Sequence, residues 1–449
     1  MAKSREPVMV ARASVQHLAA AVALLVALCL LVLPAATDDA RALTKENFVP
    51  GQIIVKLVPG VKIGDVKLRG YGLRVQERFL NQANTDIYLL KVTDGSSAQD
   101  KLGELVGDPL FGYTELNYLS EAPEANARHS AFPAGEATPT TRKYSKDPSY
   151  PDSALNLSSA QLITQGSGTT VAVLDTGAQL NHPALQARFA GVPRYDFVDD
   201  DTNPSEPAFS KNKLRLTQEV VGHGTHVAGI VNLVAPQASI MPLRVLDREG
   251  YGTTFHVAEA IAYADGNEAD VINLSLGTPS WSRLLREKVE EAIGDGVVVF
   301  AAAGNYNSLL PQYPASNLFP LPALDRDGLL AVTSVNRAEK KSDFANYGTW
   351  VDIAAPGDEI LSTYPVSKYA YWSGTSMATP FVSGEAALIH SVDRSLVPAD
   401  VEERIRLGAR CVDQKNDLRY RGMLGAGHAD VDASLRQVDG EHCIPSVNP

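Results

Sequence analysis

Alternating apolar and polar runs divide the chain into two structured regions. In the first, residues 47–123, the runs GQIIVKLVPG and TDIYLLKV are rich in apolar and β-branched residues and lie between turn signals, as strands do. The run SSAQDKLGELVGD has a serine cap and apolar positions at helical spacing, and FGYTELNYLSEAP closes the region as another strand. Strands and a helix mixed within so short a region predict a compact α+β domain.

The pattern changes in the second region, residues 147–438. Strand-like runs such as TTVAVLDTG, SIMPLRVL, ADVINLSLG, GVVVFAAAGN and LLAVTSV alternate with helix-like runs such as HGTHVAGIVNLV and SRLLREKVEEAIGDG. This alternation predicts an α/β domain whose mostly parallel sheet carries helices on both faces. Functional sites in such sheets gather at the carboxyl ends of the strands.

The segments outside these two regions predict a leader, a linker and a tail. Residues 18–36 form a long apolar run after a basic segment, which is typical of a secretory signal peptide, here assigned to residues 1–42. The alternative is an uncleaved membrane anchor, because the run is long. Residues 124–146 are rich in Ala, Pro, Thr and charge without apolar periodicity and predict an exposed linker, and residues 439–449 form a tail.

Composition narrows the classes of function. The chain has 449 residues, a formal net charge of −12 and no Lys/Arg-dense run, so nucleic acid is not expected as a partner. Outside the leader the only cysteines are Cys411 and Cys443. In an exported protein they predict one disulfide, with two free thiols as the alternative. No CxxC or Cys/His cluster indicates structural zinc.

Four residues stand where chemistry is expected, although each has an ordinary structural explanation. Asp175 ends the strand-like run VAVLD, where it can hold a histidine or simply cap a turn. His223, in GHGTHVAGI, begins an apolar helix between two glycines that leave its ring accessible. His226 follows at a spacing that does not match a zinc-protease helix, so it is expected to pack or hydrogen-bond within the helix.

The other two residues can both donate to a developing negative charge. Asn305 ends AAAGN, where its amide can donate to an oxyanion or occupy an ordinary turn. Ser376, in SGTSMATP, lies at a helix start, where its backbone N–H and the helix dipole favour negative charge; a plain N-cap is the alternative.

Taken together, DTG, GHGTH, AAGN and GTSMATP resemble the subtilisin-like serine protease family, in that family's chain order. The resemblance covers about residues 147–438. It implies that Ser376 attacks the peptide carbonyl and that His223 transfers the proton. Asp175 would orient His223, and Asn305 would form the oxyanion hole with the Ser376 N–H. Residues 47–123 resemble the family's N-terminal prodomain, a small ferredoxin-like α+β folding aid and inhibitor.

The resemblance also predicts the substrate cleft. One peptide-binding strand would comprise Leu274, Ser275, Leu276 and Gly277, and the facing strand Gly250, Tyr251 and Gly252. The S1 pocket would be lined by Ala302, Ala303, Gly304 and Gln312. A peptide held by main-chain hydrogen bonds between two edges implies broad specificity.

No cofactor is expected to be required. The run YDFVDDDTNP resembles a calcium loop found in some members, and Asp196, Asp199 and Asp201 would supply carboxylates suited to a hard cation. The alternative is an acidic surface loop without an ion.

These features predict a secreted serine endopeptidase that cleaves protein and peptide substrates. It would be made as a preproprotein that cuts itself between Ser120 and Lys146, with its own prodomain as an intramolecular inhibitor. A monomer is expected. The alternatives are a catalytically silent binding protein with a protease fold and a membrane-tethered processing protease.

Overall fold

The computed structural model describes residues 47–81, 85–125, 136–137, 150–208, 219–316 and 328–443. The leader predicted at residues 1–42 and most of the predicted linker lie outside these residues. Within the described ranges, no helix is both long enough and apolar enough to cross a membrane.

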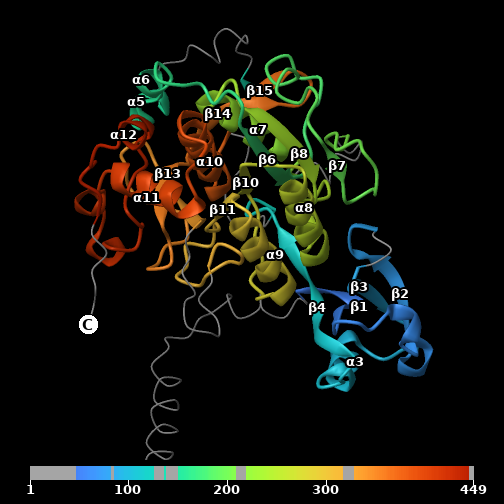
Figure 1. The fold of residues 1–449 in the computed structure, drawn as a ribbon. Helices are drawn as coiled ribbons and strands as arrows, with labels where there is room; N and C mark the ends of the chain where they lie inside the picture. Colours follow the sequence, from blue (N-terminus) through green and yellow to red (C-terminus); the bar gives the residue numbers. More distant parts are fainter. Residues whose placement is uncertain are drawn as a thin grey trace, which may run out of the picture. The chain divides into compact units, whose positions relative to one another are not determined.

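The larger domain is built on a seven-stranded sheet with the order β13-β12-β11-β10-β6-β8-β7 (Figure 1). All of its strand pairs are parallel. The strands are β6 (Thr170–Asp175), β7 (Tyr195–Asp196), β8 (Ser239–Arg244), β10 (Val271–Leu274), β11 (Val298–Ala302), β12 (Leu329–Val335) and β13 (Ile353–Pro356). The predicted subtilisin-like α/β fold is confirmed.

Helices cover both faces of this sheet because successive strand residues point to opposite sides. Val171 and Val173 of β6 pack in one core with α7 (His223–Val234) and α10 (Thr375–Val392). Ala172 and Leu174 pack in a second core with α8 (Thr254–Gly266) and α9 (Arg283–Gly294). A strand buried on both faces reads as a continuous apolar run, which is why the sequence pattern found it.

Smaller elements complete the domain. The hairpin of β14 (Ile360–Tyr364) and β15 (Lys368–Trp372) was not predicted from the sequence. Its strand β15 pairs with β5 (Glu136–Ala137), which lies inside the segment predicted to be an exposed linker. The remaining helices are α5 (Asp152–Leu155), α6 (Leu157–Ala160), α11 (Pro398–Gly408) and α12 (Val431–Arg436).

The N-terminal domain is an antiparallel sheet of order β2-β3-β1-β4. Its elements are β1 (Phe48–Leu57), β2 (Leu73–Arg78), β3 (Ile87–Val92), α3 (Ala98–Leu105) and β4 (Phe111–Glu121). Ser97 caps α3 by accepting the N–H of Asp100. This is the strand order of a ferredoxin-like unit, but two 3₁₀ turns stand where that fold has its first helix.

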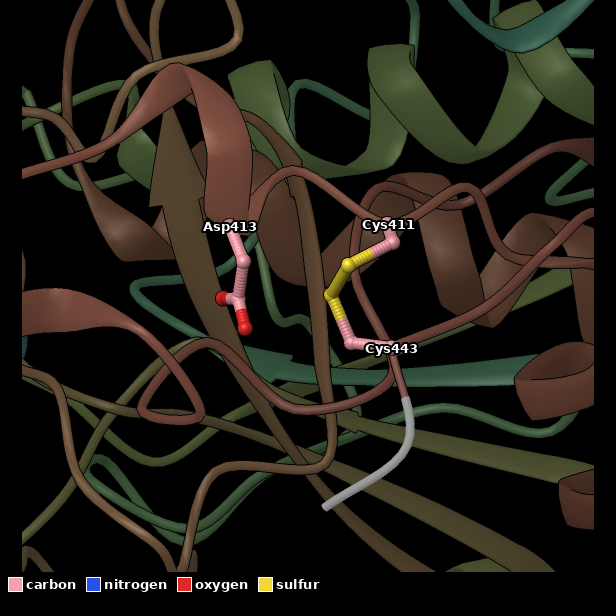
Figure 2. Close-up of side chains that lie close together, drawn as sticks. All are labelled: Cys411, Asp413 and Cys443. Atoms are coloured by element: carbon pink, nitrogen blue, oxygen red, sulfur yellow. A yellow bond between two sulfur atoms is a disulfide. The ribbon is translucent and has the colours of Figure 1, made fainter. Parts of the chain in front are cut away.

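Cys411 and Cys443 form a disulfide, as predicted (Figure 2). Asp413 lies near it, but its carboxylate accepts the backbone N–H of Gly422 through both oxygens. Since the two sulfurs are bonded to each other, Cys411, Asp413 and Cys443 do not form a metal site; the disulfide is a covalent cross-link between the tail and the domain.

Candidate active site

The four residues predicted to carry chemistry lie together at the carboxyl edge of the large sheet. Asp175 ends β6 and Asn305 follows β11, while His223 and Ser376 occupy the first turns of α7 and α10. All four are fully buried. Parallel strands place their carboxyl ends at one edge, which brings together residues that are far apart in the sequence.

Asp175 and His223 form a direct hydrogen-bonded pair. The Nδ1 atom of His223 lies 2.7 Å from Oδ1 of Asp175. The same carboxylate oxygen accepts the backbone N–H of Thr176 at 2.7 Å. Trp372 packs edge-on against the imidazole, with ring centroids 5.4 Å apart. With Nδ1 held by Asp175, the second ring nitrogen, Nε2, is the one available for chemistry.

The amide of Asn305 is oriented by the start of α10. Its Oδ1 accepts both the backbone N–H and the hydroxyl of Thr375, at 2.9 and 3.0 Å. Because the oxygen is occupied there, the Nδ2 group is free to donate toward the centre of the site. Gly374 keeps this space open, since a Cβ at that position would lie 3.0 Å from Asn305 Nδ2.

Sequence reasoning missed Glu124, whose carboxylate lies in the centre of the site. Its Oε2 accepts the hydroxyl of Ser376 at 2.7 Å and lies 3.0 Å from Nε2 of His223. Its Oε1 accepts the Asn305 amide at 2.9 Å. Glu124 is buried, so the prediction of an exposed linker is wrong at the linker's first residue. Nothing in the local sequence marks this residue, because only the path of β4 brings it here.

Two carboxylates therefore flank the buried imidazole of His223. Burial lowers the pKa of His223, but Asp175, and then Glu124, outweigh it and raise the pKa to about 10. With Glu124 in place, His223 is therefore the imidazolium form at neutral pH. An imidazolium has no free lone pair, so in this state it cannot take a proton from Ser376.

The end of β4 occupies the predicted peptide cleft as an extended strand. Leu119, Ser120 and Glu121 pair antiparallel with β9 (Tyr251–Thr253). On the other side, Glu121 and Gly277 exchange two backbone hydrogen bonds of 2.8 and 2.9 Å. The N–H of Ala122 donates to the carbonyl of Gly250 at 2.9 Å. The predicted clamp residues Gly250, Tyr251, Gly252 and Gly277 thus hold a segment of this chain itself.

The chain turns immediately after this strand. The N–H of Ala125 donates to the carbonyl of Ala122 at 2.9 Å, closing a turn through Pro123 and Glu124. As a result, the part of this segment that contacts the Ser376 hydroxyl is the side-chain carboxylate of Glu124 and not one of the segment's own peptide carbonyls.

The other predicted cleft residues are all buried: Leu274, Ser275, Leu276, Ala302, Ala303, Gly304 and Gln312. The carbonyl of Ser275 accepts the Ser376 hydroxyl at 3.3 Å. Gln312 lies between the two walls: a Cβ on Gly277 would be 3.3 Å from its Cβ, and one on Gly304 would be 2.9 Å from its Cγ. Gln312 therefore lies between Gly277 and Gly304, and its role as the floor of the S1 pocket stays a prediction.

Side chains of β4 also cap two helices of the larger domain. The carboxylate of Glu115 accepts the Ser282 hydroxyl and the N–H groups of Arg283 and Leu284, at 2.8–3.2 Å, where α9 begins. Asn117 Oδ1 accepts the N–H of Phe255 at 3.2 Å, where α8 begins. Helix N-termini have free donors that such groups satisfy. An apolar contact of both domains surrounds these caps, formed by Ile54, Phe79, Ile87, Leu89, Tyr113, Phe255, Ala258 and Leu284.

The acidic loop predicted to hold calcium is organised by an arginine. Arg244 Nη1 donates to Asp196 at 2.7 Å and to Asp199 at 2.6 Å. The other oxygen of Asp196 accepts two backbone N–H groups, and Asp201 accepts the N–H of Asn203 at 2.7 Å. Since Arg244 already neutralises two of the three carboxylates, the set does not fit a calcium ion as arranged.

His226 does not join the site. Its Nε2 lies 3.1 Å from the carbonyls of Ile360 and Ala370, in the hairpin beside α7. Burial lowers its pKa to about 3, so it is neutral and fits the expected hydrogen-bonding role.

Residues 166–427 match the model of the subtilase family. The chain belongs to the subtilase family. Residues 34–117 match the fervidolysin N-terminal prodomain. This subtilase is therefore a subtilisin-like serine protease with a prodomain.

Three comparisons place the subtilase among known proteins. It is 44% identical to thermitase from Thermoactinomyces vulgaris over 243 residues, 52% of this chain and 78% of that one. It is 31% identical to a protease of Pseudoalteromonas arctica of known structure, covering 67% of this chain and 99% of that one with a TM-score of 0.57.

The third comparison is with the crystal structure of fervidolysin from Fervidobacterium pennivorans, a keratinolytic enzyme related to subtilisin. It covers 87% of this chain with a TM-score of 0.67 and 23% identity. The subtilase spans 61% of the fervidolysin chain, and at 23% identity the comparison supports the fold alone.

Proposed function

We propose that this subtilase is an exported endopeptidase that cuts peptide bonds with an Asp175–His223–Ser376 triad. Ser376 Oγ attacks the carbonyl carbon, His223 Nε2 takes the hydroxyl proton and delivers it to the leaving amine, and Asp175 stabilises the imidazolium. The negative oxygen of the intermediate is held by Asn305 Nδ2 and the Ser376 N–H.

The observation that carries the proposal is how the Glu124 carboxylate is bound. It accepts from Ser376 Oγ and Asn305 Nδ2 and faces His223 Nε2, at 2.7, 2.9 and 3.0 Å. In a tetrahedral intermediate, Asn305 Nδ2 would contact the negative oxygen, and His223 Nε2 would face Ser376 Oγ, which has then bonded to the carbonyl carbon. A site that binds an anion through these atoms fits catalysis of acyl transfer.

We further propose that residues 47–125 inhibit the enzyme before it processes itself. The strand Leu119–Ala122 fills the cleft, and the turn that follows it carries Glu124, whose side chain contacts Ser376. Because the segment is tethered to the protease, its encounter with the cleft is intramolecular and its effective concentration is high. Cleavage there requires the turn to open, so that a peptide carbonyl replaces the Glu124 carboxylate.

Export is supported by the Cys411–Cys443 disulfide, since disulfides persist in oxidising compartments. Because Arg244 occupies Asp196 and Asp199, we do not propose calcium at Asp196, Asp199 and Asp201, and thermal melts with and without EDTA test this.

Expressing the full chain beside its Ser376→Ala variant tests the main proposal. Wild type is expected to shorten to a mature chain that hydrolyses casein and reacts with a fluorophosphonate. Ser376→Ala is expected to remain a full-length precursor without either property. If purified Ser376→Ala matures by itself to the same length, self-processing is wrong.

A further inference from the structure

Glu206 is a carboxylate that the proposed mechanism does not use, yet it contacts both sides of the Asp175–His223 pair. Its Oε2 accepts the N–H of Gly222, the residue before His223, at 3.0 Å. Its Oε1 accepts the N–H of Thr225, two residues after His223, at 2.9 Å. The carboxylate therefore holds the backbone on either side of His223.

Two hydroxyl groups complete the network around Glu206. Thr176 follows Asp175 in the chain, and its Oγ1 lies 3.2 Å from both carboxylate oxygens of Glu206. The same Oγ1 accepts the N–H of Gly224 at 3.0 Å. Thr225 Oγ1 lies 3.1 Å from Oε1 while it accepts the N–H of Gln179 at 2.8 Å. Since each hydroxyl already accepts a backbone proton, each donates its own proton to Glu206.

All four partners of Glu206 are therefore donors: two backbone N–H groups and two hydroxyls. Only an ionised carboxylate accepts from all of them, because a protonated carboxyl or an amide would direct a hydrogen at one of these donors. The partners lie on two different elements, the end of β6 and the start of α7, which also carry Asp175 and His223. Movement of one element relative to the other would change the 2.7 Å contact between Asp175 and His223.

We propose that Glu206 is a positioning residue of the catalytic centre, whose ionised carboxylate locks the start of α7 to the end of β6 and so sets the geometry of the Asp175–His223 pair. This inference rests on the proposed function of that pair. Glu206 acts through the backbone and the two threonines and does not touch the substrate.

The charge state of Glu206 adds a pH signature. Burial is the largest influence, and together with the charge of Asp175 it raises the pKa of Glu206 to about 7, although Gly222 and Thr225 donate to it. The titratable groups on the two elements packed against it are Asp175 on β6 and, on α7, His223 and His226, of which His226 stays neutral because burial lowers its pKa to about 3. Glu206 is half ionised at a pH of about 7, so the lock is nearly complete at pH 8.5 and is lost as the pH falls below 7 and Glu206 gains a proton.

The test compares mature Glu206→Gln, Glu206→Asp and wild type with a matched control, Glu402→Gln. Glu402 is also a buried carboxylate that accepts a backbone N–H, that of Gly328 at 2.9 Å, and burial also raises its pKa to about 7. It lies outside the catalytic network.

At pH 8.5 we expect Glu206→Gln to lower kcat on a peptide substrate about 10- to 100-fold, as small misplacements of catalytic groups do, with KM changed less than about twofold.

Two further readouts separate positioning from general destabilisation. The ratio of wild-type to Glu206→Gln kcat should shrink as the pH falls from 8.5 to 5.5, because wild type loses the same lock, whereas the ratio for Glu402→Gln should stay flat. Glu206→Asp, which keeps the charge, should recover part of the lost kcat. It also serves as the test variant if Glu206→Gln does not fold, since its shorter side chain should then still lower kcat more than Glu402→Gln does.

The inference is overturned if Glu206→Gln keeps wild-type kcat at pH 8.5, or if its loss of kcat is independent of pH and matches that of Glu402→Gln. Failure of the proposed function would look different. In that case wild type itself would lack turnover, or Ser376→Ala would keep it.

Discussion

Replacing Glu124 by alanine should speed self-processing. In the precursor, Glu124 contacts Ser376, His223 and Asn305 at once, so the scissile carbonyl cannot enter until this carboxylate leaves. Alanine at this position removes the competing anion and one of the two charges that hold His223 protonated. Both changes favour the reactive state of the triad.

The magnitude follows from the protonation of His223. Its pKa of about 10 means that at pH 8, two units lower, only about 1% of the imidazole is in the neutral form that can act as a base. Part of this shift comes from Asp175 and remains after the substitution. We therefore expect Glu124→Ala to raise the cleavage rate at pH 8 by about 10- to 100-fold, within the roughly 100-fold limit that the protonation state sets.

The sign of the pH dependence is fixed by the same group. The raised pKa means that the ion pair between His223 and Glu124 stabilises the inhibited state at neutral pH and is lost as the pH rises toward 10. Cleavage of wild type should therefore accelerate up to about pH 10. For Glu124→Ala the rate should level off at a lower pH.

The assay starts from denatured precursor diluted into refolding buffer. Tryptophan fluorescence follows folding and gel electrophoresis follows cleavage, so the delay between the two measures the cleavage step alone. Glu124→Gln, which keeps an acceptor oxygen but no charge, should be intermediate. Glu121→Gln is the control, because Glu121 contacts the Tyr306 hydroxyl instead of the triad. An unchanged rate and pH profile in Glu124→Ala would refute the argument.

Three other substitutions test separate parts of the structure. Asn305→Ala should lower kcat of the mature enzyme about 10²- to 10³-fold by removing an oxyanion donor, and wild-type turnover would exclude that role. Serine at both Cys411 and Cys443, which are 32 positions apart, should lower the free energy of unfolding by about 3 to 4 kcal/mol in urea melts; an unchanged midpoint would contradict this. Burial raises the pKa of Glu115 from 4.5 to about 7, so binding of the cleaved prodomain should weaken as the pH rises through this interval and stay level above it. Glu115→Gln should flatten that dependence in a pull-down of the prodomain, and an unaltered profile would exclude Glu115 as its source.

The sequence predicted the five central strands of the large sheet because they are buried on both faces, whereas the short edge strands β7 and β13 were not predicted. Runs such as the one ending at Asp175 are apolar throughout, and the alternation with helices fixes parallel pairing. The strand β2, with the sequence LRVQER, was missed because four of its six residues are polar or charged. The hairpin β14–β15 was missed for a related reason, since Ser362 and Thr363 are fully buried polar residues in it.

The candidate site was predicted only where the residue and its short motif carry the signal. Asp175, His223, Asn305 and Ser376 each occur in such a motif, and the structure brings them together. Glu115, Glu124 and Glu206 occur in unremarkable local sequence. Each of these carboxylates is positioned by the hydrogen-bond donors that face it, and the donors belong to residues between 16 and 252 positions away in the chain.

The difference between residues that occur in a motif and carboxylates that do not has a general physical cause. A nucleophile or base needs a particular element and a particular neighbour in the chain, such as the helix start at Ser376, and therefore leaves a local pattern. A carboxylate that satisfies donors needs only to be an acceptor of the right length at the right point in space. For Glu124 that point is set by the register of β4 against Gly277 and β9, because a shift of one residue would move the turn that follows the strand, and Glu124 with it, along the cleft. The same register that fills the cleft therefore also places the anion in the catalytic centre, so inhibition and self-processing depend on one strand pairing.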